Sequence, residues 1–231
     1  MWQSITPSDV LIKLFSGGSR SISNTVVSGR LDLAPLTSAH CDAWSELISR
    51  DVLSAGDIIN MSACDERHLQ PESLNTLHNW ITAHGVVPSQ SKPCMFLTRG
   101  AGFHHDADSY PDEAFCVLWL AEDTKWDLLF PFTGHRIPLE YGTVVIFDSA
   151  QPHGLVLRGQ STFDRDLFDL EPTGIFVSQD FDLTPANRKL LGIKKYSRKG
   201  IASMPILSDG AFRQDLDPES GTWHIRSILV A

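Results

Sequence analysis

The sequence predicts a mainly β protein with flanking helices, and three observations support this. Short apolar runs separated by turn residues fill the middle of the chain, at residues 94–98, 115–120, 126–132, 143–147 and 174–177. β-branched and aromatic residues, which favour strands, are concentrated in these runs, most clearly at 143–147. Helical spacing of apolar residues is confined to the two flanks. Many short strands in succession predict a sandwich or barrel.

The two flanks complete what we expect to be a single domain of 231 residues. A helical N-terminal portion of about 90 residues is expected, with a short helix over 8–15 and longer ones over 36–52 and 71–84. An edge strand is expected over 25–33. A C-terminal extension from about residue 183 to 231 should contain a helix and end in a strand from residue 223. No internal repeat or low-complexity linker divides the chain.

Composition argues against several classes of function. The formal net charge is -9 and the pI about 5.4, so the surface repels phosphate backbones and no nucleic-acid partner is expected. The basic cluster at 188–199 is expected to be solvated. No apolar run reaches membrane-spanning length and no signal peptide is recognisable, so a cytoplasmic protein is expected. Four cysteines without a CxxC pair predict neither disulfides nor a zinc site: Cys41, Cys64, Cys94 and Cys116.

A His-His-Asp motif at the centre of the chain predicts a metal site. His104 and Asp106 are two residues apart, so in an extended segment they point to the same face and His105 to the other. His153 follows the predicted strand at 143–147, with room for about four strands between Asp106 and itself. It meets the pair only if the sheet folds back, as a double-stranded β-helix does. Two imidazoles and one carboxylate on one face of a metal suit mononuclear iron. The alternative is that these are hydrogen-bonded loop residues.

Four segments around this motif resemble the Fe(II)/2-oxoglutarate-dependent dioxygenases, most closely the prolyl-4-hydroxylase-like branch. They are residues 99–106, 126–131, 142–148 and 152–154. The resemblance implies a double-stranded β-helix (jelly roll, cupin-like). It implies that His104, Asp106 and His153 form the catalytic centre as iron ligands. The cofactors would be Fe(II), 2-oxoglutarate and O2. The reaction would be hydroxylase-type oxidation of a C–H bond, coupled to decarboxylation of 2-oxoglutarate to succinate.

The sequence departs from this family where the cosubstrate is held. The family usually binds the far carboxylate of 2-oxoglutarate through an Arg or Lys about ten residues beyond the distal His, on the next strand. The strand predicted at 174–177 contains neither. Arg158 lies five residues beyond His153 and Arg165 twelve, and these are the candidates for binding 2-oxoglutarate, although Arg158 is expected to point outward. Two further candidates rank below them: Arg99 and Arg136.

Two other functions fit the same residues. A cupin-like metalloprotein that does not use 2-oxoglutarate is favoured by the missing cation, and a non-catalytic jelly-roll binding module is the third possibility. If the chain is an oxygenase, its substrate is a small molecule or a protein side chain. Asp180 and Asp182 are expected on a solvated face.

Overall fold

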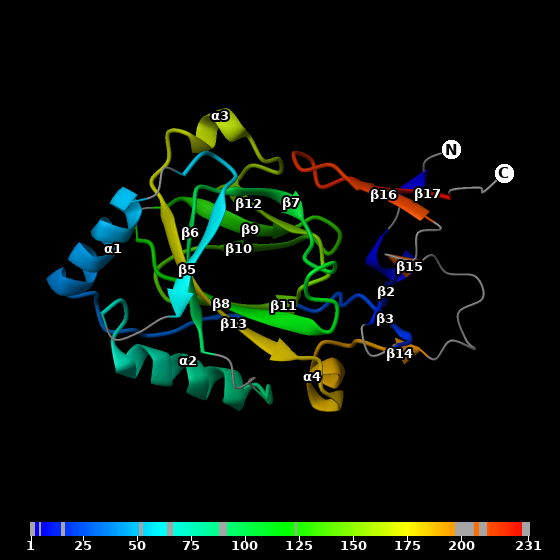
Figure 1. Cartoon of the computed structure of the whole chain (residues 1–231), viewed down its shortest axis with the longest axis horizontal. Coiled ribbons are helices and arrows are strands. Elements are labelled where there is room, and N and C mark those ends of the chain that lie inside the picture. The colour runs from blue at the N-terminus through cyan, green and yellow to red at the C-terminus, as the bar shows by residue number, and fades with distance from the viewer. Residues whose placement is uncertain are drawn as a thin grey trace.

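The computed structural model describes most of the chain. The described residues are 3–4, 6–14, 17–50, 53–63, 67–87, 92–122, 124–196, 206–207 and 212–227. Cys64, the end of the basic cluster and the last residues of the C-terminal extension lie outside this part. Within it, two facing sheets form the body of the molecule, and a smaller unit made from the two ends of the chain packs beside them (Figure 1).

The body is a jelly roll. Its larger sheet has the order β4-β11-β8-β13-β6-β5 and its smaller sheet the order β10-β9-β12-β7, with antiparallel pairing throughout. The strands are β4 (Val27–Arg30), β5 (Ile58–Ala63), β6 (Cys94–Thr98), β7 (Ala101–His104), β8 (Glu113–Trp119), β9 (Trp126–Phe130), β10 (His135–Pro138), β11 (Thr143–Asp148), β12 (His153–Leu157) and β13 (Gly174–Asp182). From β6 to β13 the chain changes sheet at every step except the β9–β10 hairpin. This winding is that of a double-stranded β-helix, so the predicted fold is confirmed.

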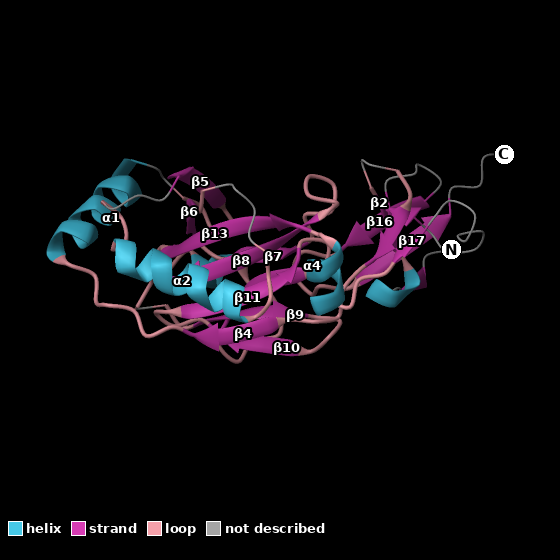
Figure 2. Cartoon of the chain, turned by 90° about the horizontal axis from the view of Figure 1, so that it is seen from below, coloured by secondary structure: helices cyan, strands magenta, loops and turns pink. Residues whose placement is uncertain are grey.

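Apolar residues fill both sides of the larger sheet. One face packs against α1 (Ser38–Arg50) and α2 (Pro71–Ala83), where Leu77 and Ile81 of α2 meet buried residues of β6, β8 and β11 (Figure 2). The other face packs against the smaller sheet. Pro71 opens α2 and Gly85, with φ of 77°, follows its end, as the sequence predicts for this helix. Among the described helices, none is long and apolar enough to cross a bilayer.

The two ends of the chain form the smaller unit together. It contains β1 (Gln3–Ser4), β2 (Leu11–Lys13), β3 (Ser19–Ser21), β14 (Lys195–Tyr196), β15 (Ile206–Leu207), β16 (Phe212–Leu216) and β17 (Trp223–Ser227). Each N-terminal strand pairs with a C-terminal one: β1 with β17, β2 with β15 and β3 with β14. A separate core joins them, in which Val10, Ile12, Trp223 and Ile225 are buried. This unit lies at one end of the jelly roll (Figure 1).

Several segments differ from the sequence prediction, among them the strands β1, β3, β14, β15 and β16, which were not predicted. The helix expected over 8–15 is wrong: a 3-10 turn, η1 (Pro7–Asp9), leads into strand β2. The apolar spacing there looks helical, but β2 is stabilised by β3 and β15, of which β15 lies far along the chain. Strand β5 was not predicted either. The segment 160–172 contains a short helix, α3 (Arg165–Phe168), before β13. The helix expected in the C-terminal extension is present as α4 (Pro185–Leu190).

Candidate metal centre

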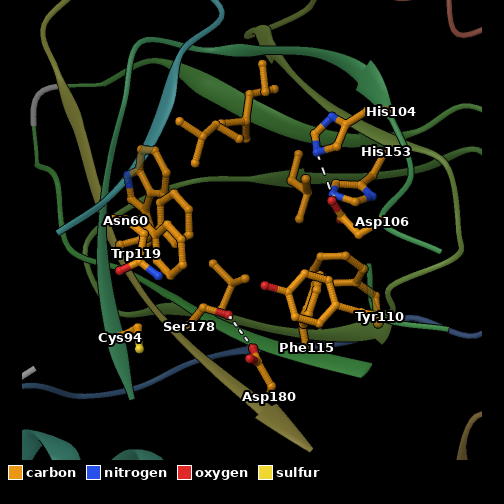
Figure 3. Close-up of a pocket in the computed structure, with 18 of the residues that line it drawn as sticks. Asn60, Cys94, His104, Asp106, Tyr110, Phe115, Trp119, His153, Ser178 and Asp180 are labelled. Carbon is orange, nitrogen blue, oxygen red and sulfur yellow. Dashed lines mark hydrogen bonds and ion pairs between the residues drawn. The ribbon is translucent and has the colours of Figure 1, made fainter. Parts of the chain in front are cut away.

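The structure brings His104, Asp106 and His153 together at one end of the two sheets. His104 ends β7 and His153 begins β12, and the two are paired across these neighbouring strands. Their ring centroids are 4.5 Å apart. An Oδ2 atom of Asp106 lies 3.7 Å from Nε2 of His153 and 4.0 Å from Nε2 of His104. Figure 3 shows the three side chains converging on one point. The four strands between Asp106 and His153 that the spacing predicts are β8 to β11.

Both imidazoles are oriented by the backbone. Nδ1 of His104 lies 2.8 Å from the carbonyl oxygen of Gly102, and Nδ1 of His153 lies 2.8 Å from that of Gln151. A carbonyl only accepts, so each Nδ1 donates its hydrogen and each Nε2 keeps its lone pair. The two Nε2 atoms are those nearest Asp106. This tautomer is the one that a metal-binding histidine needs.

A network of buried hydrogen bonds holds the turn that precedes His153. Arg20 and Asp148 form a fully buried bidentate ion pair, and the Asp148 carboxylate also accepts from the backbone of Ser23 and Ala150. The backbone N–H of Asp106 donates to the carbonyl of Ser149, 2.8 Å away. The turn between β11 and β12 is therefore tied both to the N-terminal segment and to the backbone of Asp106.

The donor set fits a divalent metal ion. Two ligand atoms bonded to one ion at about 2.1 Å lie roughly 3.0–3.4 Å apart. The separations of 3.7 and 4.0 Å are slightly wider, so small side-chain rotations close the site. Burial raises the pKa of Asp106, and burial followed by the neighbouring His104 lowers the pKa of His153 well below its usual range. Burial thus disfavours the charged form of the Asp106 carboxylate and favours the neutral form of the His153 imidazole. A cation at the centre would stabilise the charged carboxylate and would bind the neutral imidazole.

A cavity of about 300 Å³ adjoins the centre and lies between the two sheets. The larger sheet contributes alternate residues of β8 (Phe115, Val117, Trp119) and of β13 (Phe176, Ser178, Asp180), since every second side chain of a strand points to the same face. The smaller sheet and its loops contribute Ala101, Leu128, Leu139 and Leu155. The walls are therefore mostly apolar, and the metal centre occupies one end (Figure 3).

The two arginines predicted to bind 2-oxoglutarate lie elsewhere. Arg158 points away from the cavity, with Nε 3.5 Å from Oδ1 of Asp127 and a guanidinium nitrogen 3.6 Å from Glu140. Its outward direction agrees with the sequence prediction. Arg165, at the start of α3, lines a second cavity, which shares Ile58, Ala101 and His104 with the first. Among the described residues that line the first cavity, none is a lysine or an arginine.

The remaining basic candidates, Arg99 and Arg136, and also His105 lie outside the lining of the first cavity. Arg136 donates to the Asp127 carboxylate at 2.6 Å and to the carbonyl of Gln160 at 2.7 Å, and Arg99 lines neither cavity. His105 points away from the metal centre, as predicted, with its ring 5.4 Å from that of Trp223. It therefore faces the unit built from the two ends of the chain.

The structure as a whole is similar to several solved proteins. No family model matches the sequence. No curated protein matches it either. The viral collagen prolyl hydroxylase of Paramecium Bursaria Chlorella virus-1, solved with 2-oxoglutarate, has a TM-score of 0.43 and 11% identity over 69% of this chain and 96% of its own. A prolyl-4-hydroxylase of Pseudomonas putida gives 0.41 and 14% over 69% and 92%. The non-heme alpha-ketoglutarate-dependent epimerase SnoN gives 0.43 and 13% over 84% and 85%.

Sequence reasoning missed several polar residues of the cavity. They are Asn60, Tyr110, Ser178 and Asp180. The expectation that Asp180 lies on a solvated face is wrong, because β13 continues to Asp182 instead of ending near residue 177. The signal was present as the alternation of Phe176, Ser178 and Asp180, which places all three on one face of a longer strand. Asp182, in contrast, is exposed.

Proposed function

We propose that this chain is an Fe(II)- and 2-oxoglutarate-dependent dioxygenase that oxidises a C–H bond and converts 2-oxoglutarate to succinate. One observation carries the proposal: Nε2 of His104, Nε2 of His153 and a carboxylate oxygen of Asp106 face a common point. Two histidines and one carboxylate leave several metal positions open, which is the ligand set of non-heme Fe(II) oxygenases. Fe(II) held there would supply the site for O2 and for the oxo-acid end of 2-oxoglutarate.

The cavity supports an oxygenase in a second way. Its walls are mostly apolar, so they suit the carbon chain of a substrate held against the metal centre. A volume of about 300 Å³ suits a small molecule or a single side chain of a protein. We propose one of these as the substrate.

Arg165 is the basic residue that we propose for the far carboxylate of 2-oxoglutarate. It lines the second cavity together with His104, so a guanidinium is available beside the metal centre. Arg158 is less suited, because Asp127 and Glu140 already surround it. The neutral donors in the first cavity are the hydroxyls of Tyr110 and Ser178 and the amide of Asn60.

A second candidate is a cupin-like metalloenzyme that does not use 2-oxoglutarate. The observation in its favour is the lining of the first cavity, where the described residues include no lysine or arginine but do include the carboxylate of Asp180. A dicarboxylate gains less in such a cavity than a neutral molecule or a cation does.

Anaerobic titration of the Fe(II)-loaded protein with 2-oxoglutarate tests the proposal. Chelation of Fe(II) by the oxo acid gives a weak visible charge-transfer band, and aeration should then release succinate. The band should be lost in the His153→Ala variant and kept in His105→Ala, whose side chain faces Trp223. Fe(II) uptake without a band supports the second candidate. A protein that takes up no Fe(II) contradicts both.

A further inference from the structure

Asp180 places a carboxylate in the wall of the cavity, away from the metal ligands. It lies on β13, paired with Phe115 of β8, and both line the cavity. Its Oδ1 lies 3.5 Å from the hydroxyl of Ser178, which lines the cavity as well. Figure 3 shows Asp180 and Ser178 on the larger sheet, across the open centre from His104 and His153.

Aromatic rings make up much of the wall around this carboxylate. Phe176 stacks on Phe96, with ring centroids 5.0 Å apart and planes 4° from parallel, and it also stacks on Trp119 at 6.0 Å. On the other side, Tyr110 and Phe115 meet edge to face at 5.1 Å. All five rings line the cavity. The faces of aromatic rings carry negative partial charge and attract cations.

The carboxylate of Asp180 acts on several neighbouring titratable groups. Burial, followed by the charge of Asp180, raises the pKa of the Cys94 thiol, the Tyr110 hydroxyl and the Glu113 carboxyl. The pKa of Asp180 itself is raised. Burial and the charge of Asp106 raise it, and together they outweigh the hydrogen bond from Ser178, which lowers it. A cation beside Asp180 would favour the charged carboxylate and would be desolvated among ring faces, where cation–π attraction is strongest.

We propose that this cavity binds a substrate with a positively charged alkylammonium group, held between Asp180 and the aromatic rings of Tyr110 and Phe115, the latter paired with Asp180 across β8 and β13. This rests on the proposed function for its chemistry: the carbon chain attached to the ammonium group would run toward the metal centre, where a C–H bond is oxidised. The Asp180 carboxylate disfavours an anionic group beside it, and the rings select a methylated or otherwise apolar cation over a strongly hydrated one.

A pair of probes that differ only in charge tests the proposal without turnover. Choline carries a trimethylammonium group, and 3,3-dimethylbutanol has the same shape with a neutral carbon in place of nitrogen. Calorimetric titration of the metal-free and the Fe(II)-loaded protein should show choline binding about tenfold more tightly or better. The preference does not require iron, so it is measurable even if the protein proves not to be an oxygenase. Conversely, a 2-oxoglutarate band without a preference for choline would overturn this proposal alone.

Three variants connect the preference to the proposed residues. Asp180→Asn keeps the shape of the side chain and should abolish the tenfold preference, whereas Asp182→Asn, at the exposed end of the same strand, should keep it. Phe115→Leu removes the ring paired with Asp180 and should weaken binding of choline more than binding of its neutral analogue. Thermal unfolding of each variant verifies folding. Equal binding of the two probes to the unaltered protein, binding of neither, or an undiminished preference in Asp180→Asn would each overturn the proposal.

Discussion

Arg20 and Asp148 form a bidentate ion pair in which neither side chain is exposed to solvent, with both nitrogen–oxygen distances at 2.8 Å. Arg20 belongs to β3 and Asp148 ends β11, only five residues before His153. The pair therefore fixes the turn that positions His153 to a strand from the N-terminal part of the chain. It makes the geometry of the candidate metal centre depend on a residue that is not one of its three side chains.

Removal of Arg20 should strongly destabilise the protein. In Arg20→Ala the Asp148 carboxylate stays buried without its charged partner, which costs about 3–5 kcal/mol. The free energy of unfolding, measured by denaturant titration, should fall by this amount. The matched control is Arg30→Ala, which breaks an exposed ion pair with Glu140 and should cost less than about 1 kcal/mol. Similar losses in the two variants would contradict the structural role of the buried pair.

Loss of a predicted ligand should abolish metal binding. His153→Ala and Asp106→Ala each remove one of three ligands. Even the loss of a residue that only orients a ligand costs about 10–100-fold in metal affinity, so we expect more than about 100-fold here. Titration with Fe(II) under anaerobic conditions measures the affinity. His105→Ala, one residue from both His104 and Asp106 in sequence, should bind Fe(II) like the unaltered protein, and loss of binding in this variant would refute the ligand assignment.

The two arginine candidates should differ in their effect on 2-oxoglutarate. If Arg165 holds the far carboxylate, Arg165→Ala loses charge-assisted hydrogen bonds worth about 1.5–3 kcal/mol, so the Kd for 2-oxoglutarate should rise roughly 10–100-fold. Arg158→Ala should leave it unchanged, because Arg158 lies among Asp127 and Glu140 outside the cavity. The charge-transfer band provides the Kd. An unchanged Kd in Arg165→Ala would rule out this residue and favour the neutral donors Tyr110, Ser178 and Asn60.

A side chain at Gly154 should disturb the metal centre by packing alone. An added Cβ atom would lie 2.8 Å from the ring of Phe103 and 3.2 Å from the carbonyl oxygen of Ala101, both on β7. Gly154→Ala should therefore push β12 away from β7, cost about 1–3 kcal/mol of stability and weaken Fe(II) binding. Gly134→Ala provides the comparison. The φ of 71° at Gly134 strains an alanine, but no atom lies within 4 Å of a Cβ atom added there. It should lose stability and keep its affinity for Fe(II).

The jelly roll and the convergence of His104, Asp106 and His153 could be predicted because their signals are local. The two-residue spacing of His104 and Asp106 predicts that they point to the same side, and the apolar run of β11 precedes His153 by one short turn. The order of strands between them required only short, recognisable segments. The direction of Arg158 likewise follows from the alternation of side chains along a strand that begins at His153.

The parts that could not be predicted depend on distant partners. Leu11, Leu14 and Phe15 have the spacing of a helix, and only pairing with β3 and with β15, far along the chain, makes Leu11–Lys13 a strand. Arg20 carries no sign of burial in its own neighbourhood, since its partner Asp148 comes from another part of the fold. Asp180 looks solvated for the same reason: its polar segment becomes a cavity wall only because it pairs with β8.

The pairing of β1, β2 and β3 with β17, β15 and β14 also has a consequence for synthesis of the protein. These strands leave the ribosome long before the segments that complete their sheets, so their unpaired backbone groups are open to wrong pairing until residues 195–227 have been made. Contacts between such distant segments also slow folding. A product that stops short of residue 206 would leave β2 without β15 and β1 without β17, and we expect such fragments to aggregate although every residue of the jelly roll is present.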